Sequence, residues 1–172
     1  MKVAYFPGCS LHSTGVEFDI SVREVCKALD IELEEIEGWV CCGATSAHAT
    51  NHLLSLAMPA YSLALAERMP VQDVIAPCAA CFNRLKHTAV LSQDKETYEK
   101  IRELLPIPWE NRLQVRNLLD LFSGISEEIK GKVKKPLSDL KLACYYGCLL
   151  VRPPHICQFD DPENPQTMDE LM

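Results

Sequence analysis

Three short apolar runs in the first half of the chain have the length and composition of buried strands. They are Val-Ala-Tyr-Phe-Pro at residues 3–7, the segment 31–36, in which apolar residues are interleaved with glutamates, and residues 71–76. Pro7 and Pro77 close the first and third runs, because proline has no N–H group to offer a strand ladder. The pattern therefore predicts three strands, separated by segments long enough to hold helices.

A helical pattern follows each of these runs. After the first, Thr14 and Glu17 have the spacing of a capping box, and apolar residues then recur at helical spacing: Phe18, Val22, Val25 and Leu29. After the second, residues 45–69 form a long Ala/Leu-rich helical stretch. Pro59 is expected to kink or split it, because proline removes a backbone donor and clashes with the preceding turn. After the third, residues 79–91 have a helical pattern.

Beyond residue 91 the pattern predicts mainly helix. Residues 95–105 form a charged amphipathic segment, residues 115–123 and 126–134 are expected to be two short helices, and residues 140–146 one further strand. Strands that alternate with helices are typical of a parallel sheet covered by helices. The sequence predicts an α/β fold, with an open parallel sheet and flanking helices in a Rossmann-like βαβαβ unit, followed by a helical C-terminal extension.

Two segments far apart in the chain have similar sequences. Residues 3–11 (VAYFPGCSL) resemble residues 142–150 (LACYYGCLL), which suggests that a second copy of the same unit begins near residue 140. The last part, 153–172, is rich in proline and has no apolar period. We expect a first domain over residues 1–138, and over residues 139–172 the start of a second, incomplete unit with a loop-like tail.

Composition and charge narrow the functional classes. Of the 172 residues, 48% are hydrophobic and 24% charged, the balance of a globular domain with a core. The net charge of −7 and the pI of about 5.2 exclude the basic surface expected of a nucleic-acid-binding protein. The sequence has neither an apolar run of about 18 residues nor the apolar core of a signal peptide. We therefore expect no direct membrane span and a cytoplasmic location.

Five of the nine cysteines follow the three predicted strands. Cys9 comes after the first strand, Cys41 and Cys42 after the second, and Cys78 and Cys81 after the third. The carboxyl ends of parallel strands share one rim, where ligands of open α/β sheets bind. The N-termini of the following helices stabilise thiolates at such a rim. The nine cysteines are an odd number in a chain without an export signal, so ligation or redox chemistry is favoured over disulfides.

Several chemistries are compatible with this cysteine pattern. Structural zinc sites use four ligands, usually in two closely spaced pairs. The adjacent residues Cys41 and Cys42 point in different directions and suit a multi-iron cluster better than one tetrahedral ion. Zinc remains an alternative. So do a thioredoxin-type role for Cys78 and Cys81 alone and the possibility that the cysteines are inert and packed as small hydrophobes.

Four sequence motifs resemble one family. Phe-Pro-Gly-Cys9-Ser, Cys41-Cys42-Gly-Ala, Ala-Pro-Cys78-x-x-Cys81 and Tyr-Tyr-Gly-Cys148-Leu-Leu-Val-Arg-Pro are similar to the cysteine-rich CCG domain, in particular to that of the heterodisulfide reductase B subunits. The resemblance implies that a noncubane [4Fe-4S] iron–sulfur cluster is held by the first five of these cysteines: Cys9, Cys41, Cys42, Cys78 and Cys81. Cys148 matches the first ligand of a second such site, whose other motifs the sequence lacks, as if the protein were truncated after the first.

The same resemblance implies a function and partners. It indicates an iron–sulfur oxidoreductase subunit that delivers electrons to a small thiol–disulfide substrate in anaerobic metabolism. It also implies a reductase complex with a ferredoxin-like iron–sulfur subunit and a flavin-containing subunit. Because the second cysteine set is incomplete, these residues would not complete a two-cluster mechanism alone. Two alternatives remain: a non-catalytic electron-transfer subunit of an anaerobic dehydrogenase-type complex, and a zinc-stabilised interaction module.

Among the histidines, His12 is the candidate catalytic residue. It follows Cys9 by three residues and could give a proton to a product thiolate near neutral pH, although a histidine facing solvent is the simpler interpretation. His48 and His52 have the spacing of one helix face but lack the intervening glutamate of a metalloprotease motif. We expect these two, and His87, to lie on exposed helix surfaces.

The remaining cysteines have no partner in the CCG pattern. Cys26, in the first predicted helix, and Cys144, in the last predicted strand, are expected to pack in the core. Cys157 is expected in a loop with no assigned partner. Gly43, after the Cys-Cys pair, is expected to allow a tight turn, since glycine accepts positive φ freely.

Overall fold

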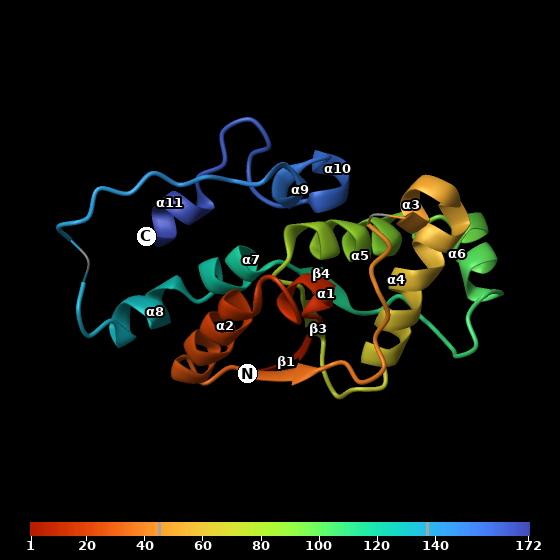
Figure 1. Ribbon diagram of the computed structural model, residues 1–172, viewed down its shortest axis with the longest axis horizontal. Coiled ribbons are helices and arrows are strands. Elements are labelled where there is room, and N and C mark those ends of the chain that lie inside the picture. Colours follow the sequence, from red (N-terminus) through yellow and green to blue (C-terminus); the bar gives the residue numbers. More distant parts are fainter. Residues whose placement is uncertain (45, 137) are drawn as a thin grey trace.

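The computed structural model describes residues 1–44, 46–136 and 138–172. Four parallel strands form one sheet in the order β2-β1-β3-β4 (Figure 1): β1 (Lys2–Tyr5), β2 (Glu32–Glu35), β3 (Asp73–Ile75) and β4 (Gln114–Arg116). In the central strand β1, Tyr5 lies opposite Glu35 on one side and Ile75 on the other. The predicted α/β fold with an open parallel sheet and flanking helices is confirmed.

Helices cover both faces of the sheet. Those of the first part of the chain are α1 (Gly8–Leu11), α2 (Val16–Ala28), α3 (Ser46–Thr50), α4 (His52–Ala66), α5 (Ala79–Leu91) and α6 (Lys95–Arg102). Side chains of β1 alternate between two cores. Val3 and Tyr5 pack with α2, while Ala4 and Phe6 pack with α4, α5 and α6. All four are fully buried, as expected for a strand covered on both sides.

The C-terminal part of the chain is built from short helices. They are α7 (Leu118–Ser123), α8 (Ser126–Lys132), α9 (Cys148–Val151), α10 (Pro154–Cys157) and α11 (Thr167–Leu171). In Figure 1 the segment that contains α9 and α10 lies over α5, and both helices contact it. Asn83 of α5 fixes this contact, since its Nδ2 donates to the carbonyls of Leu149 and Arg152. The division of the chain at residue 138 stays a prediction.

The strand β4 was missed by the sequence pattern. Residues 115–123 were predicted to be one helix, but residues 114–116 pair with β3 and the helix begins only at Leu118. The reason is the cap at Asn117, whose side chain accepts a hydrogen bond from the Asp120 N–H and so starts the helix there. The other three strands were predicted correctly. The structure shortens β2 and β3 at both ends, whereas β1 begins one residue earlier than predicted, at Lys2, and ends at Tyr5.

The predicted helix after the first strand is present, but its start and its buried face differ. The N-cap of α2 is Gly15 with no side-chain cap, so the capping box is wrong. Val22 is buried as expected, whereas Phe18 and Val25 are 47% and 42% exposed. Asp19 takes a place on the buried face instead, because the Tyr5 hydroxyl donates to its carboxylate over 2.6 Å.

The long helical stretch breaks at Asn51 and not at Pro59. Asn51 caps α4 by accepting a hydrogen bond from the Leu54 N–H, which ends α3 one residue earlier. Pro59 lies buried inside α4. The backbone oxygen of Ser55, four residues before it, loses its usual helical donor and instead lies 3.4 Å from a guanidinium nitrogen of Arg84. The prediction also included Thr45, which lies outside the described residues.

The predicted strand over residues 140–146 is wrong. This segment has no strand partner among the described residues and runs as irregular chain. Leu140 and Leu142 are 56% and 53% exposed. Cys144 is only partly buried and belongs to neither core, which corrects its predicted packing. A strand needs a neighbour to accept and donate its backbone hydrogen bonds, and this segment pairs with none of the four strands that the structure describes.

Candidate functional site

The five cysteines lie where the first three strands lead into helices. Cys9 is in α1 directly after β1, and Cys41 and Cys42 lie in the connection after β2. Cys78 is the N-cap of α5 and Cys81 lies in its first turn. The carboxyl ends of β1, β2 and β3 are neighbours in the parallel sheet, so segments far apart in sequence meet at one rim.

Contacts among the thiols join the five residues into one cysteine centre. The Cys81 thiol is in hydrogen-bonding contact with those of Cys42 and Cys78. The Cys41 thiol is in contact with that of Cys9. Since Cys41 and Cys42 are adjacent in the chain, they link the buried group of three to the exposed pair. The arrangement expected from the strand order is thus present.

Two of these thiols favour the thiolate form. The pKa of Cys78 is lowered to about 6, first by a hydrogen bond from the Cys81 thiol and further by the N–H groups of Ala80 and Cys81 at the start of α5. The pKa of Cys42 is lowered to about 7, mainly by a hydrogen bond from Cys81, with help from the Ala44 N–H and the charge of Arg84. Both thiols are therefore substantially ionised near neutral pH.

The thiols of Cys81 and Cys41 have raised pKa values and hold their protons. The pKa of Cys81 is strongly raised, because its single proton is shared with Cys42 and Cys78 and because it is buried. The Gly43 N–H, 3.4 Å from the Cys41 sulfur, acts to lower the pKa of Cys41, but burial and the neighbouring thiols Cys42 and Cys9 raise it overall. Loss of these protons would leave a compact group of thiolates that needs a cation.

Two glycines shape the centre. Gly8 has φ of +71°, and a Cβ atom there would lie 2.6 Å from the sulfur of Cys81. Gly43 has φ of +74°, as expected for the turn after the Cys-Cys pair, and a Cβ there would lie 3.0 Å from the Cβ of Ala47. Glycine is required at both positions by conformation and by space.

The donor set fits a soft metal group. Thiolates are the ligands of iron–sulfur clusters and of zinc, and no carboxylate or imidazole shares a hydrogen bond with the five sulfurs. Within residues 1–44, 46–136 and 138–172, no three Cys, His, Asp or Glu side chains are arranged to hold one metal ion. Thiolates from separate segments of the chain suit the several metal atoms of a cluster better than one tetrahedral ion.

His12 lies beside the centre and is oriented by a carboxylate. It follows α1 directly, and its Nε2 is 3.1 Å from Glu35 Oε1. The indole N–H of Trp39 donates to the same oxygen, and the guanidinium of Arg23 donates to the other. The imidazole also lies edge-on to the Trp39 ring. His12 is thus held within a polar network, and its role as proton donor stays a prediction.

The remaining cysteines are placed differently from one another. Cys26 is fully buried in the core, as predicted, and burial raises its pKa to about 11. Cys157 was expected in a loop without a partner, but it lies in α10, is 1% exposed, and its sulfur accepts a hydrogen bond from Asn83. The correction follows from the packing of α10 on α5. Cys148 is exposed at the start of α9.

Arg84 was not among the predicted site residues, and the predicted exposure of His87 is wrong. Arg84 lies one helical turn after Cys81 on α5, and its charge acts on the Cys42 thiol. That spacing of three residues was the signal that could have identified it. His87 was expected on an exposed face but is half-buried, and burial and nearby basic groups lower its pKa to about 4. His48 and His52 are exposed, as predicted.

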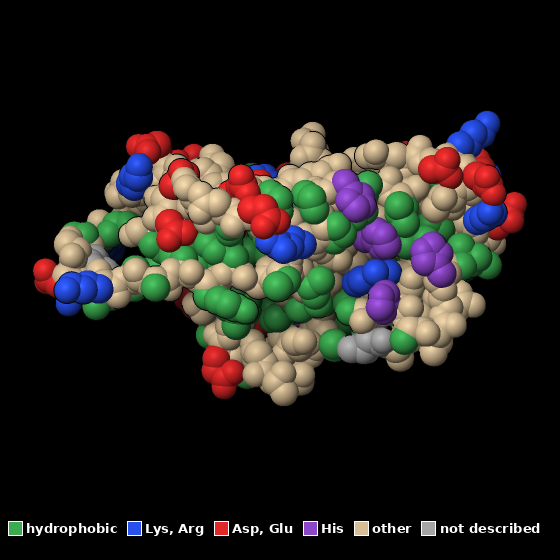
Figure 2. All heavy atoms as spheres, turned by 90° about the horizontal axis from the view of Figure 1, so that it is seen from above, with side chains coloured by type: hydrophobic (Ala, Val, Ile, Leu, Met, Phe, Trp, Pro, Cys, Tyr) green, Lys and Arg blue, Asp and Glu red, His purple; other side chains and the backbone are tan. Residues whose placement is uncertain are grey.

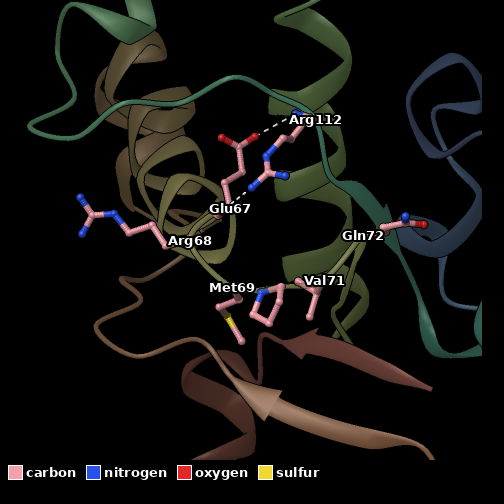
Figure 3. A pocket seen from close by; sticks show the side chains of 7 residues that line it. Glu67, Arg68, Met69, Val71, Gln72 and Arg112 are labelled. Carbon is pink, nitrogen blue, oxygen red and sulfur yellow. Dashed lines mark hydrogen bonds between the residues drawn. The ribbon is translucent and has the colours of Figure 1, made fainter.

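A pocket of about 430 Å³ lies away from the cysteines, near the amino end of β3 (Figure 3). Its lining includes Glu67 and Arg112, which are hydrogen-bonded to one another as Figure 3 shows. The Glu67 carboxylate also accepts a hydrogen bond from the Glu110 N–H. These contacts satisfy the hydrogen bonds of the carboxylate and connect the end of α4 to the segment before β4. Glu67 and Arg112 thus have a structural role in this pocket.

The chain is similar to one known domain family and to several known proteins. Residues 3–86 match the CCG cysteine-rich domain family. The chain is 36% identical to the 8-methylmenaquinol:fumarate reductase membrane anchor subunit of Wolinella succinogenes, with 99% of this chain and 61% of that protein covered. It is 25% identical to a protein of Archaeoglobus profundus that is described as like the B subunit of heterodisulfide reductase, with 99% and 60% covered.

The B subunit of the ferredoxin/F420H2-dependent CoB-CoM heterodisulfide reductase of Methanosarcina acetivorans is also 25% identical, with 99% of this chain and 59% of that protein covered. The chain thus spans about three fifths of the length of the curated relatives it matches. Although one relative is a membrane anchor subunit, none of the helices in the described residues has the length and apolar character needed to cross a bilayer. The chain is thus similar to the CCG cysteine-rich domain family over residues 3–86, and to heterodisulfide reductase B subunits over almost its whole length.

Proposed function

We propose that this chain is an iron–sulfur electron-transfer subunit that delivers electrons to a small disulfide. The proposed ligands of a noncubane [4Fe-4S] cluster are the five residues of the cysteine centre: Cys9, Cys41, Cys42, Cys78 and Cys81. When bound, such a cluster supplies one-electron redox chemistry together with iron atoms that attract sulfur ligands. The observation that supports the proposal most strongly is the contact of thiols from three separate strand ends at one rim.

The residues around the centre have separate tasks in this proposal. The N–H groups at the start of α5 stabilise negative charge on Cys78, and the Gly43 N–H does the same for Cys41. Gly8 lets the backbone approach Cys81 closely. Together these groups hold several thiolates near one another, which would otherwise be costly because like charges repel.

His12 would hold the proton that a product thiolate needs. Reduction of a disulfide consumes two electrons and two protons and releases two thiols. Glu35 Oε1 lies 3.1 Å from Nε2 of His12 and so fixes the orientation of the ring. We propose that the electrons come from a ferredoxin-like iron–sulfur subunit and a flavin-containing subunit of a reductase complex. We also propose that the protein is located in the cytoplasm and takes part in anaerobic metabolism.

The metal content of the chain tests the first part of this proposal. After anaerobic reconstitution we expect iron and acid-labile sulfide in equal amounts, lost in Cys41→Ser and kept in Cys144→Ser, which changes a cysteine outside the centre. Zinc without sulfide would contradict the proposal and support the zinc-stabilised module. Reduction of a disulfide by the reconstituted chain with a reduced viologen dye tests the second part. Activity that survives Cys9→Ser would indicate a bare thiol-exchange enzyme of Cys78 and Cys81.

A second candidate function is electron transfer without catalysis. The 36% identity to a subunit of an 8-methylmenaquinol:fumarate reductase favours it. In that case the reduced chain would pass electrons to a partner subunit of a dehydrogenase-type complex and leave disulfides untouched. The two functions are separated by mixing the chemically reduced chain anaerobically with a disulfide, or with its co-purified partner subunits and their acceptor, and recording which mixture reoxidises it.

A further inference from the structure

Histidine side chains gather around a basic side chain on one face of the molecule (Figure 2). Arg84 and His87 lie on α5, and the charge of Arg84 acts on His87. His87 is also within electrostatic reach of three histidines from other segments, in α3, at the start of α4 and in α10: His48, His52 and His155. We call these five residues the His–Arg patch.

The patch lacks acidic groups. Besides burial, the only charged neighbour that shifts the pKa of Arg84 is the Cys42 thiol. All the charged neighbours that shift the pKa of His87 are basic. Within the part of the chain that the structure describes, no carboxylate forms an ion pair with Arg84. The chain as a whole has 24 acidic and 17 basic residues, so a basic patch without acids is not a consequence of composition.

The patch offers hydrogen-bond donors and few acceptors. One guanidinium nitrogen of Arg84 donates to the hydroxyl and the carbonyl of Ser55, at 3.1 and 3.4 Å. Its Nε, and Nδ1 of His87, are enclosed and have no hydrogen-bond partner among the described residues. His48, His52 and His155 are exposed. Desolvation of a cation without a paired anion is costly, and a bound anion would remove that cost.

A cation does not suit this patch. The guanidinium repels it, and among the described residues the histidines are not arranged to hold a metal ion. An oxyanion suits it well, because arginine binds carboxylate, sulfonate or phosphate oxygens with parallel N–H groups and protonated imidazoles add further donors. Arg84 lies one helical turn from Cys81 and acts on Cys42, so an anion here would be beside the cysteine centre.

We propose that the His–Arg patch is a substrate subsite that binds an oxyanionic group carried by the disulfide. That the ligand is a disulfide rests on the proposed function. That the ligand carries a negative charge rests on the patch alone. Arg84 would provide the fixed positive charge. The three exposed histidines, His48, His52 and His155, would add hydrogen-bond donors in their protonated form, and the patch would hold the substrate so that its sulfur atoms reach the cysteine centre.

Inorganic sulfate is the first probe, because it is a dianion at every pH between about 6 and 8. Calorimetry and histidine ring NMR signals on the whole chain should show sulfate binding that is about tenfold tighter at about pH 6 than at about pH 8, because protonated imidazoles add positive charge and donors. Arg84→Gln should weaken binding at least about tenfold. Arg68→Gln removes an exposed arginine outside the patch and should leave binding unchanged.

A second variant keeps the test valid if Arg84→Gln does not fold. Arg84 also bonds to Ser55, so its substitution could disturb α4. The triple variant His48→Gln, His52→Gln, His155→Gln changes only exposed side chains. It should keep the unfolding transition and lose the pH dependence of sulfate binding. Sulfate affinity that is unchanged in both variants, or lowered equally by Arg68→Gln, would overturn the inference.

Disulfide kinetics separate this inference from the proposed function. With dithiodiglycolate, which carries carboxylates, Arg84→Gln should lower kcat/KM at least about tenfold, whereas for neutral bis(2-hydroxyethyl) disulfide the change should stay within about twofold. Reduction of both disulfides at equal kcat/KM without sulfate binding would contradict the inference alone. Sulfate binding at the patch without reduction of either disulfide would contradict the proposed function and leave the anion site standing.

Discussion

Residues 3–11 and 142–150 have similar sequences and different structures. The first segment forms β1 and then α1, and Val3, Ala4 and Tyr5 are fully buried. The second runs as irregular chain into α9, and Leu142 and Tyr145 are 53% and 84% exposed. Both segments place a Gly-Cys pair at the start of a short helix. The glycine conformations differ, with φ of +71° at Gly8 and −68° at Gly147, so the two segments share the short helix but neither the turn nor the strand.

The difference lies in the neighbours of the two segments. β1 is hydrogen-bonded to β2 on one side and β3 on the other. The second segment has no strand beside it among the described residues. The same holds for the cysteines: Cys9 contacts Cys41 at a rim shared with three other cysteines, whereas Cys148 is exposed. A cysteine of such a motif thus contacts other cysteines only where the sheet places their segments beside it.

The largest expected effect comes from the matched pair Cys9→Ser and Cys148→Ser. We expect Cys9→Ser to lose most of the iron and sulfide bound after anaerobic reconstitution, because one proposed ligand is removed. We expect Cys148→Ser to keep them. Iron and sulfide per chain, with the absorption spectrum, measure both. Equal loss in the two variants would show that the second segment contributes to the same centre.

The pair Phe6→Ala and Tyr145→Ala tests the difference in packing. Phe6 is fully buried between the sheet and α4, so its truncation should lower the free energy of unfolding by about 3–5 kcal/mol. Tyr145, the equivalent residue of the second segment, is 84% exposed, and its truncation should change stability by less than about 0.5 kcal/mol. Urea unfolding measures both values. A large effect at Tyr145 would mean that the second segment packs against a surface absent from this structure.

The glycines of the two segments form a third pair. Gly8→Ala should lower stability by about 1–3 kcal/mol, because alanine is strained at positive φ and its Cβ would meet the Cys81 sulfur at 2.6 Å. Gly147 has φ of −68° and free space around the position of a Cβ, so Gly147→Ala should be neutral or slightly stabilising. Thermal unfolding and reconstituted iron content check the pair. Normal iron binding by Gly8→Ala would contradict the close approach of α1 to Cys81.

The smallest expected effect is a pH dependence that arises from His87. Its pKa is lowered from 6.5 to about 4 in the folded chain. Above about pH 6.5 His87 is neutral in both the folded and the unfolded chain, so its protonation does not lower the free energy of unfolding there. As the pH falls toward 4 the unfolded chain binds a proton first, so the free energy of unfolding decreases, by about 1 kcal/mol after solvent screening.

Urea unfolding at pH 7 and pH 5 should therefore show a smaller loss of stability in His87→Gln than in the unchanged protein. His155→Gln is the matched control, because His155 lies exposed in the C-terminal segment. An identical pH dependence in the unchanged protein and in His87→Gln would show that burial does not hold the imidazole neutral.

Most of the cysteine centre could be predicted from the sequence, whereas its surroundings could not. Three strands followed by helices, with cysteines at their ends, implied one rim before any contact was known. The network joins His12, which directly follows α1, to Glu35, the last residue of β2, and to Trp39, which follows β2, and no periodicity relates them. The His–Arg patch joins four elements, α3, α4, α5 and α10, and the contact of Arg84 with Ser55 exists only because α4 packs on α5.

Local sequence determined the features that depend on a few neighbouring residues. The α/β alternation, the three strands, α5 and the glycine turn after Cys42 follow from apolar spacing and backbone freedom, which act over single turns and strands. Tertiary structure decided which apolar face of α2 is buried, that α4 continues through Pro59, and that residues 140–146 do not form a strand. Each of these depends on a hydrogen-bond or packing partner that is distant in the chain, and local spacing contains no information about that partner.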